Sequence, residues 1–288
     1  MRDGNYIFDA HMHYTGIFKP PDMSFIDYLD ANGIDRAIIN TLNTKANMSV
    51  LKDKMGQLLK LGKTNLQKFN IFSEFSENGQ PDHQKVIELQ KSNPERIFPF
   101  FWYNPTDPKD EDQKKGLKIL EDALNNEFYG VKLQLAMIPV AVERLYPVAE
   151  LLTKYDKPLY IHPSGGVFAA PRTSPFSLIP LVRENPDLKL IIGHASYTME
   201  FVIEVVAAVK SLGTLAKNIF FETSVSIPFG IASYAKIFGA DHVLFGSDTP
   251  PASPWTPEYD KIALMNLPTS QKKLIFNDNT ARLLKVTK

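Results

Sequence analysis

The chain has 288 residues, contains no cysteine, and balances 32 lysines and arginines with 32 aspartates and glutamates. The absence of cysteine excludes disulfides and thiolate metal ligands, which leaves His, Asp and Glu as candidate ligands. The balanced charge gives no overall field to attract nucleic acid or an anionic membrane, and the apolar runs are far shorter than the roughly 20 residues of a membrane span. We therefore expect a cytoplasmic protein without a secretory signal that binds a small molecule, neither nucleic acid nor membrane, and can form a homo-oligomer.

Short apolar runs rich in β-branched and aromatic residues alternate with amphipathic stretches along the whole chain. The runs that we predict to be strands cover residues 6–11, 36–40, 69–75, 96–104, 128–135, 158–162, 188–194, 218–224 and 242–248. Helix-like stretches separate them, the first ending at Gly33 and the last being QKKLIFNDNTARLLKV. Such alternation gives parallel strands joined by helices, and about eight units favour a closed barrel. We predict one (β/α)8 TIM-barrel domain over residues 1–288, with 69–75 either an additional strand or an irregular segment.

The first predicted strand lies in NYIFDAHMH and ends in two histidines, His11 and His13. Side chains on a strand alternate between its faces, so Asp9, His11 and His13 are predicted to share one face. Met12 is then on the opposite face and packs against the helix layer. Asp9 is placed either to orient a ligand histidine or to bind local backbone groups. Taken alone, the histidine pair fits both a metal site and a solvated strand end.

Later predicted strands also end in polar residues that can bind a metal: His162, His194 and Asp248. The carboxyl ends of parallel barrel strands converge on one rim, where barrel enzymes place their active sites. One strand-end histidine is more often structural, but a set in matching positions indicates a shared site. His83 begins a predicted helix and His242 begins a predicted strand, so we expect structural roles for both, at the surface or as caps.

Imidazole and carboxylate groups suit one divalent metal ion, Zn²⁺ first, with Mn²⁺, Fe²⁺ or Co²⁺ as alternatives. A metal that keeps a bound water lowers the pKa of that water from ~15.7 to about 7. Asp248 is the candidate to take this proton and deliver it to a leaving group. Lys132, at the end of the 128–135 run, either binds a substrate carboxylate, carries a carboxylated nitrogen between two metals, or extends to solvent. Substrate binding is slightly favoured.

The motifs FDAHMH, GVKLQ, LYIHPSG, LIIGHAS and VLFGSDTP, together with the closing LIFNDNTARLLKV, resemble the amidohydrolase superfamily. The resemblance is to its amidohydrolase-related branch, which contains aminocarboxymuconate-semialdehyde decarboxylase-like and pyrone-dicarboxylate lactonase-like enzymes. It implies a TIM barrel of the metal-dependent hydrolase type with a single metal held by His11, His13, His162 and Asp248. It also implies a catalytic or metal-adjacent role for His194, and Asp248 as the proton shuttle. Lys132 matches a bridging position of binuclear members that usually does not bridge in this branch.

Three residues near the predicted rim are candidates for substrate contact: Trp102, Tyr103 and Arg172. Trp102 and Tyr103 form either a stacking wall or rim packing, and Arg172 either clamps a carboxylate or stays in solvent. We expect a metal-dependent hydrolase of a C–O or C–N bond, of lactone or amide type, in a small carboxylated molecule. The alternatives are a metal-dependent non-oxidative decarboxylase of an aromatic or muconate-type acid and, less favoured, an inactive metal-binding barrel.

Overall fold

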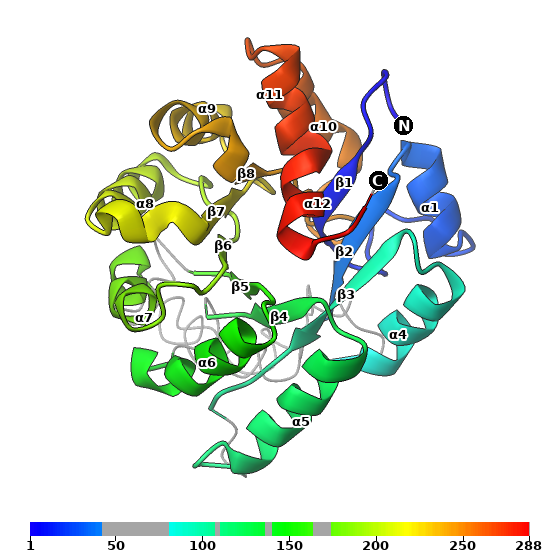
Figure 1. Cartoon of the computed structure of the whole chain (residues 1–288). Coiled ribbons are helices and arrows are strands. Elements are labelled where there is room, and N and C mark those ends of the chain that lie inside the picture. The colour runs from blue at the N-terminus through cyan, green and yellow to red at the C-terminus, as the bar shows by residue number, and fades with distance from the viewer. Residues whose placement is uncertain (42–80, 107–109, 136–139, 164–173, 288) are drawn as a thin grey trace, which may run out of the picture.

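Eight parallel strands form the centre of the protein in the order in which they occur in the chain (Figure 1). The structure is a computed structural model that describes residues 1–41, 81–106, 110–135, 140–163 and 174–287. Its strands are β1 (Phe8–Met12), β2 (Arg36–Asn40), β3 (Ile97–Trp102), β4 (Gly130–Leu133), β5 (Leu159–Ile161), β6 (Leu190–Ile192), β7 (Ile219–Glu222) and β8 (Val243–Leu244). The predicted TIM barrel is confirmed; seven of these strands lie within predicted runs, and β1 extends one residue beyond the predicted 6–11. The 69–75 run lies outside the described residues.

Helices surround the strands and cover the outside of the barrel (Figure 1). They are α1 (Phe25–Asn32), α4 (His83–Ser92), α5 (Lys114–Asn126), α6 (Tyr146–Lys154), α7 (Ile179–Glu184), α8 (Met199–Lys210), α9 (Pro228–Ile237), α10 (Trp255–Ala263), α11 (Thr269–Lys273) and α12 (Asn279–Leu284). Local sequence signals fix their ends. In α1, the Ser24 side chain accepts a hydrogen bond from the Asp27 amide, and Gly33 takes the left-handed conformation that ends the helix, as predicted.

The barrel closes where β1 meets the chain that follows β8. The Ala10 amide donates to the Phe245 carbonyl at 2.7 Å, and the Asp248 amide donates to the His11 carbonyl at 2.7 Å. These bonds satisfy backbone groups that would otherwise form two open sheet edges. They also place the end of β1 directly beside Asp248.

Two apolar clusters divide the core. The inner one fills the barrel with strand side chains and includes Ala281 and Leu283 of α12, which therefore closes one end of the barrel. Its strand members are Phe8, Ala10, Ile38, Phe98, Phe100, Tyr160, Ile191, Phe220 and Leu244. The outer cluster packs the other strand face against the helices. Strands covered on both faces need the near-continuous apolar runs that the sequence shows.

One prediction for β1 is wrong, because a register irregularity between Asp9 and Met12 interrupts its alternation. Asp9 faces outward and accepts a hydrogen bond from the indole Nε1 of Trp255 in α10 at 3.1 Å. His11 and His13 face the barrel mouth instead. An extra residue on a strand reverses the faces beyond it, which a strict two-residue period does not anticipate. Met12 is fully buried in the outer cluster, as predicted.

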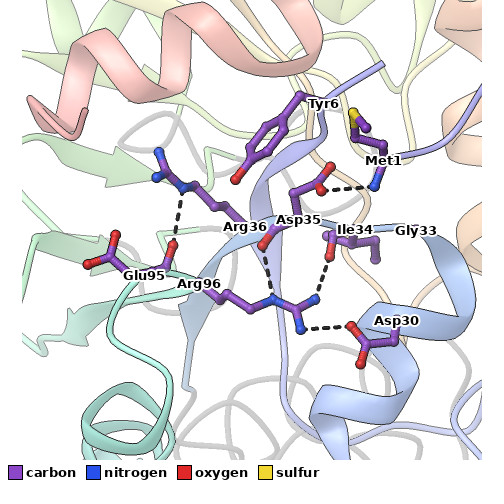
Figure 2. A pocket seen from close by; sticks show the side chains of 9 residues that line it. All are labelled: Met1, Tyr6, Asp30, Gly33, Ile34, Asp35, Arg36, Glu95 and Arg96. Carbon is purple, nitrogen blue, oxygen red and sulfur yellow. Dashed lines mark hydrogen bonds and ion pairs between the residues drawn. The ribbon is translucent and has the colours of Figure 1, made fainter. Parts of the chain in front are cut away.

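A hollow of about 380 Å³ lies where the chain enters β1, β2 and β3, at the opposite end of the barrel from the histidines (Figure 2). Its charged groups are largely paired with one another: Arg96 Nη1 contacts Asp30 Oδ1 at 2.7 Å, and the Met1 amine contacts Asp35 Oδ1 at 2.8 Å. The Arg36 guanidinium lies 5.7 Å from the centre of the Tyr6 ring. This end of a barrel contributes stability rather than catalysis, and we assign these contacts to it.

His83, the first residue of α4, has the expected structural role but is neither a surface residue nor a cap. Asp82 caps the helix, while the His83 ring stacks on Phe101 at 4.1 Å and its Nε2 accepts the Trp102 amide at 3.1 Å. Burial lowers the pKa of His83 to about 4. His242 also has a structural role, since its Nδ1 contacts the Ile219 carbonyl at 2.7 Å.

The lowered pKa of His83 predicts a loss of stability in acid. The unfolded chain binds the proton near pH 6.5, whereas the folded chain resists it until about pH 4, so stability present at neutral pH falls as the pH drops through this window. We expect this group to contribute on the order of 2 kcal/mol. Urea unfolding of the wild type and of His83→Phe at pH 7 and pH 4.5 measures it. A wild-type loss no larger than that of His83→Phe would contradict the assignment.

Candidate metal centre

The polar residues singled out at the strand ends gather at one mouth of the barrel. His11 lies near the end of β1 and His13 directly follows it, Lys132 lies in β4, and the other three follow β5, β6 and β8: His162, His194 and Asp248. His162 is half-buried, and the others are buried. Residues up to 237 positions apart in the chain thus share one small region, as the barrel rim predicted.

Asp248 is the residue on which the histidines converge. Its Oδ1 lies 3.1 Å from His13 Nε2 and 3.5 Å from His11 Nε2, and its Oδ2 lies 3.7 Å from His194 Nε2. Burial raises the pKa of Asp248, but the positive charge that the surrounding histidines carry when protonated outweighs burial and leaves the pKa below its usual range. The carboxylate is therefore the stable form of this side chain when a positive charge lies beside it.

Backbone carbonyls fix the protons of two histidines. His13 Nδ1 lies 2.9 Å from the Asn40 carbonyl, and His194 Nδ1 lies 3.2 Å from the Ser224 carbonyl. A carbonyl only accepts hydrogen bonds, so each Nδ1 carries a proton, and any lone pair of these rings is on Nε2. His194 Nε2 is buried and has no hydrogen-bond partner among the described residues.

His11 completes the arrangement. Burial, followed by the charge of Lys132, lowers the pKa of His11 well below its usual value, so the ring is neutral. Lys132 Nζ lies 3.1 Å from His11 Nε2 and 3.5 Å from the centre of the Tyr160 ring. Burial lowers the pKa of Lys132 itself to about 7. At 1% exposure its side chain does not extend to solvent, which removes one of the three readings of this lysine.

Imidazole lone pairs facing a carboxylate make a cation site, since acceptor atoms repel one another unless a positive charge lies between them. His11, His194 and Asp248 offer ligand atoms that all lie within 4.8 Å of one another. Nitrogen and oxygen donors of this kind fit a divalent transition-metal ion. The His162 ring packs on His194, with centroids 4.1 Å apart. This group of three contains His194, whereas the resemblance implied a catalytic or metal-adjacent role for that residue.

Local backbone conformation turns two of these side chains into the mouth. His194 and Asp248 have φ of 48° and 55°, in the left-handed region that few residues other than glycine adopt. Gly193 faces the barrel, because a Cβ there would lie 2.3 Å from the Tyr160 ring, so simple alternation would send His194 outward. Such conformations concentrate at functional sites.

The residues predicted to contact the substrate take different positions in the structure. Trp102 follows Phe98 and Phe100 on the inward face of β3 and is paired in register with Lys132. Its buried indole Nε1 has no hydrogen-bond partner in the described part of the chain. Tyr103 packs in the outer cluster and donates to Gln113 at 3.2 Å, so it forms rim packing and not a wall of the mouth. Neighbouring strand residues face opposite sides. Arg172 lies outside the described residues.

Sequence reasoning missed the polar groups beneath the histidines. Tyr160, Glu222 and Ser224 are buried inside the barrel and contact His11 or His194. Asp9, which the sequence did single out, lies on the outer side of β1, and its Oδ1 accepts the amides of His11 and Ser247 at 3.1 Å each. It thus binds backbone, one of the two roles left open for it, and joins the segments that carry His11 and Asp248.

Comparison with known proteins adds to this geometry. The profile of the family described as Amidohydrolase matches residues 8–286. The chain belongs to this family. A search of curated proteins gives no match. Within the part of the chain that the structure describes, no helix is long and apolar enough to cross a membrane.

Several solved structures have the same barrel fold as this chain. One is 5-carboxyvanillate decarboxylase from Novosphingobium aromaticivorans, with 15% identity, TM-score 0.66, and coverage of 99% of this chain and 97% of that chain. Another is 2,6-dihydroxybenzoate decarboxylase from Rhizobium, with 17% identity, TM-score 0.67, and coverage of 98% and 99%. A third is a probable 2-pyrone-4,6-dicarboxylic acid hydrolase from Acinetobacter baumannii, with 13% identity, TM-score 0.62, and coverage of 97% and 99%. At such identities the likeness shows the common fold.

Proposed function

We propose that this member of the amidohydrolase family is a metal-dependent, non-oxidative decarboxylase of a small hydroxylated aromatic or muconate-type carboxylic acid. The observation that carries the proposal is the buried cation site of His11, His194 and Asp248 with the Lys132 amine beside it. A metal ion and a protonated lysine together attract a carboxylate. Two structures with the same fold are named decarboxylases of aromatic acids, and one of them contains manganese.

Unpartnered polar groups near this site support an acid that also carries a hydroxyl group. Asn40, Trp102 and Gln134 take inward positions at the ends of β2, β3 and β4. Asn40 Nδ2 and Oδ1, Trp102 Nε1 and Gln134 Oε1 are buried with no partner among the described residues. Leaving such atoms unpaired costs about 1–3 kcal/mol each, which a ligand with both donors and acceptors would offset.

We assign the metal one ion per chain, held by His11, His13, Asp248 and one of His162 and His194. Zinc and manganese both suit these donors. When bound, the metal supplies a Lewis acid that polarises an oxygen of the substrate. We propose that Lys132 Nζ binds the substrate carboxylate, and that Trp102 forms one wall beside it.

Decarboxylation replaces a C–COO⁻ group with C–H, so one proton must reach the carbon that loses CO₂. We propose that, with His162 as the fourth metal ligand, His194 Nε2 holds this proton, because it is buried, has no hydrogen-bond partner among the described residues, and lies 3.7 Å from Asp248 Oδ2. Asp248 then exchanges the proton between His194 and solvent. Transfer by a group placed in this way contributes typically 10²–10⁴-fold to the rate.

Hydrolysis of a C–O or C–N bond is the second candidate. It is favoured by the likeness to a probable pyrone dicarboxylic acid hydrolase, and by the position of Asp248 among the histidines, where it can take a proton from water. We do not propose an inactive barrel, because the proton-transfer residue is present together with the metal-binding group.

A panel of hydroxylated benzoates, muconate-type acids and lactones distinguishes the two reactions. We expect CO₂ release from an aromatic or dienoic acid, loss of this activity on chelation, and recovery with a divalent ion. A lactone that opens with uptake of water and no CO₂ would favour hydrolysis. Turnover that persists unchanged in metal-free enzyme would contradict both proposals.

A further inference from the structure

Glu222, the last residue of β7, is a fully buried carboxylate on the inner face of the barrel. Its Oε2 accepts hydrogen bonds from the Tyr160 hydroxyl at 2.7 Å, the Ser224 hydroxyl at 2.8 Å and the His194 amide at 3.0 Å. Its Oε1 accepts the Ser224 amide at 2.5 Å. A buried carboxylate requires this many donors, and here two of them are hydroxyls that also contact the metal-site histidines.

Each hydroxyl has a single proton, and that proton is committed to Glu222. The oxygens of Tyr160 and Ser224 can therefore only accept from the histidines. The Tyr160 oxygen lies 2.8 Å from His11 Nδ1, and the Ser224 oxygen lies 3.2 Å from His11 Nδ1 and 2.9 Å from His194 Nδ1. Both rings must present an N–H at Nδ1.

We propose that Glu222 is a positioning residue that, through Tyr160 and Ser224, holds the proton of His11 on Nδ1. For His194, the Ser224 hydroxyl adds to the carbonyl contact that already fixes its Nδ1 proton. The Nε2 atoms of both rings then face Asp248 with a lone pair that can bind a divalent ion or, in His194, take up a proton. This inference rests on the proposed metal site. A partner of this kind on the second ring nitrogen fixes the tautomer and the orientation of a ligand histidine.

Two glycines leave the space that the side chains of Glu222 and Tyr160 occupy. A Cβ on Gly246, in the chain after β8, would lie 2.0 Å from Glu222 Oε1, and a Cβ on Gly193 would lie 2.3 Å from the Tyr160 ring. Gly246 lies against Glu222 and stands two residues before Asp248. Gly193 lies against Tyr160 and stands one residue before His194. The space for the Glu222 network is thus encoded in the same segments as the candidate ligands.

Glu222→Gln tests the inference, because an amide keeps the shape but donates from one side. The Tyr160 and Ser224 hydroxyls then face either an N–H group or a neutral oxygen that accepts more weakly than a carboxylate, so one of them can turn and donate to His11 Nδ1, and that ring moves its proton to Nε2. We expect ¹⁵N NMR of the metal-free protein to show this change of tautomer for His11, and Zn²⁺ affinity, measured by competition with a chromophoric chelator, to fall about 10–100-fold. Tyr160→Phe and Ser224→Ala each remove one hydroxyl acceptor of His11 Nδ1 and should reproduce part of this change, while His194 keeps its Nδ1 proton because the Ser224 carbonyl remains.

Glu258→Gln is the matched control. Glu258 is also a buried carboxylate, but it lies in α10 and accepts the Val225 amide at 3.0 Å and the Ser253 hydroxyl at 3.0 Å. The Glu258→Gln variant should have a lower melting temperature than the wild type, with unchanged histidine tautomers and Zn²⁺ affinity. If Glu222→Gln does not fold, Tyr160→Phe and Ser224→Ala carry the test.

Unchanged tautomers in the folded Glu222→Gln protein, or in both hydroxyl variants, would overturn the positioning role. A wild-type protein that binds no divalent ion would instead refute the proposed function. The tautomer measurement on metal-free protein still decides the role of Glu222 in that case.

Discussion

Asp248→Asn is expected to reduce kcat by at least 100-fold and to weaken binding of a divalent ion by a similar factor. The amide keeps the size of the side chain but removes the negative charge on which His11, His13 and His194 converge. Proton transfer by a carboxylate contributes typically 10²–10⁴-fold, and loss of a metal ligand adds to this loss. Steady-state kinetics on the substrate found in the panel, with metal quantification of the same samples, measures both effects.

Asp241→Asn is a suitable control for this variant. Asp241 is an exposed carboxylate just before β8, at the opposite end of the same strand. An exposed substitution of this kind usually changes stability by less than ~0.5 kcal/mol. An Asp248→Asn enzyme that retains both its metal and its activity, like the control, would mean that Asp248 has neither role.

The second large effect is a pair of opposite outcomes at adjacent residues of β1. Met12→Ala should cost about 2–5 kcal/mol of unfolding free energy, because it leaves a cavity in the fully buried outer cluster, while metal binding is kept. His11→Ala should abolish high-affinity metal binding, because it removes the central imidazole of the site. Its effect on the stability of the metal-free protein should be smaller than that of Met12→Ala.

Chemical denaturation of metal-free samples and equilibrium dialysis against Zn²⁺ separate the two effects. If both variants lose stability and both keep their metal, the assignment of His11 as a ligand fails. If Met12→Ala loses its metal while still folded, the division of β1 into an inner and an outer face fails.

The barrel could be predicted because its physical causes are local. Strands buried on both faces need continuous apolar runs, and helices between them need an apolar stripe and a stop such as Gly33. The chain-order arrangement of β1 to β8 follows the general rule that consecutive parallel strands lie side by side, joined by right-handed crossovers. The rim position of His11, His13, His194 and Asp248 then follows from their places at strand ends.

Asp9 shows where this reasoning fails. It faces away from His11 and His13 because an irregularity in the pairing of β1 with β2, located after Asp9, reverses the faces of the residues that follow, and the apolar pattern does not record this. Tyr103 shows the reverse case: strict alternation, applied from Trp102, would have placed it outside the mouth.

The network of Glu222 could not be found from the sequence for a different reason. Its contact with Tyr160 joins residues 62 positions apart, and no local spacing marks such a pair. The signal available is indirect. Gly193 and Gly246 stand just before His194 and Asp248, and their missing side chains make the space that Tyr160 and Glu222 fill.

Titration of the metal-free wild-type protein with Co²⁺, followed by visible absorption, tests the metal site most directly. The arrangement of His11, His194 and Asp248 predicts saturation at one ion per chain, and no saturable binding in His11→Ala. A wild-type protein that shows no saturable uptake of Co²⁺, Zn²⁺ or Mn²⁺ would contradict the metal centre at the barrel mouth.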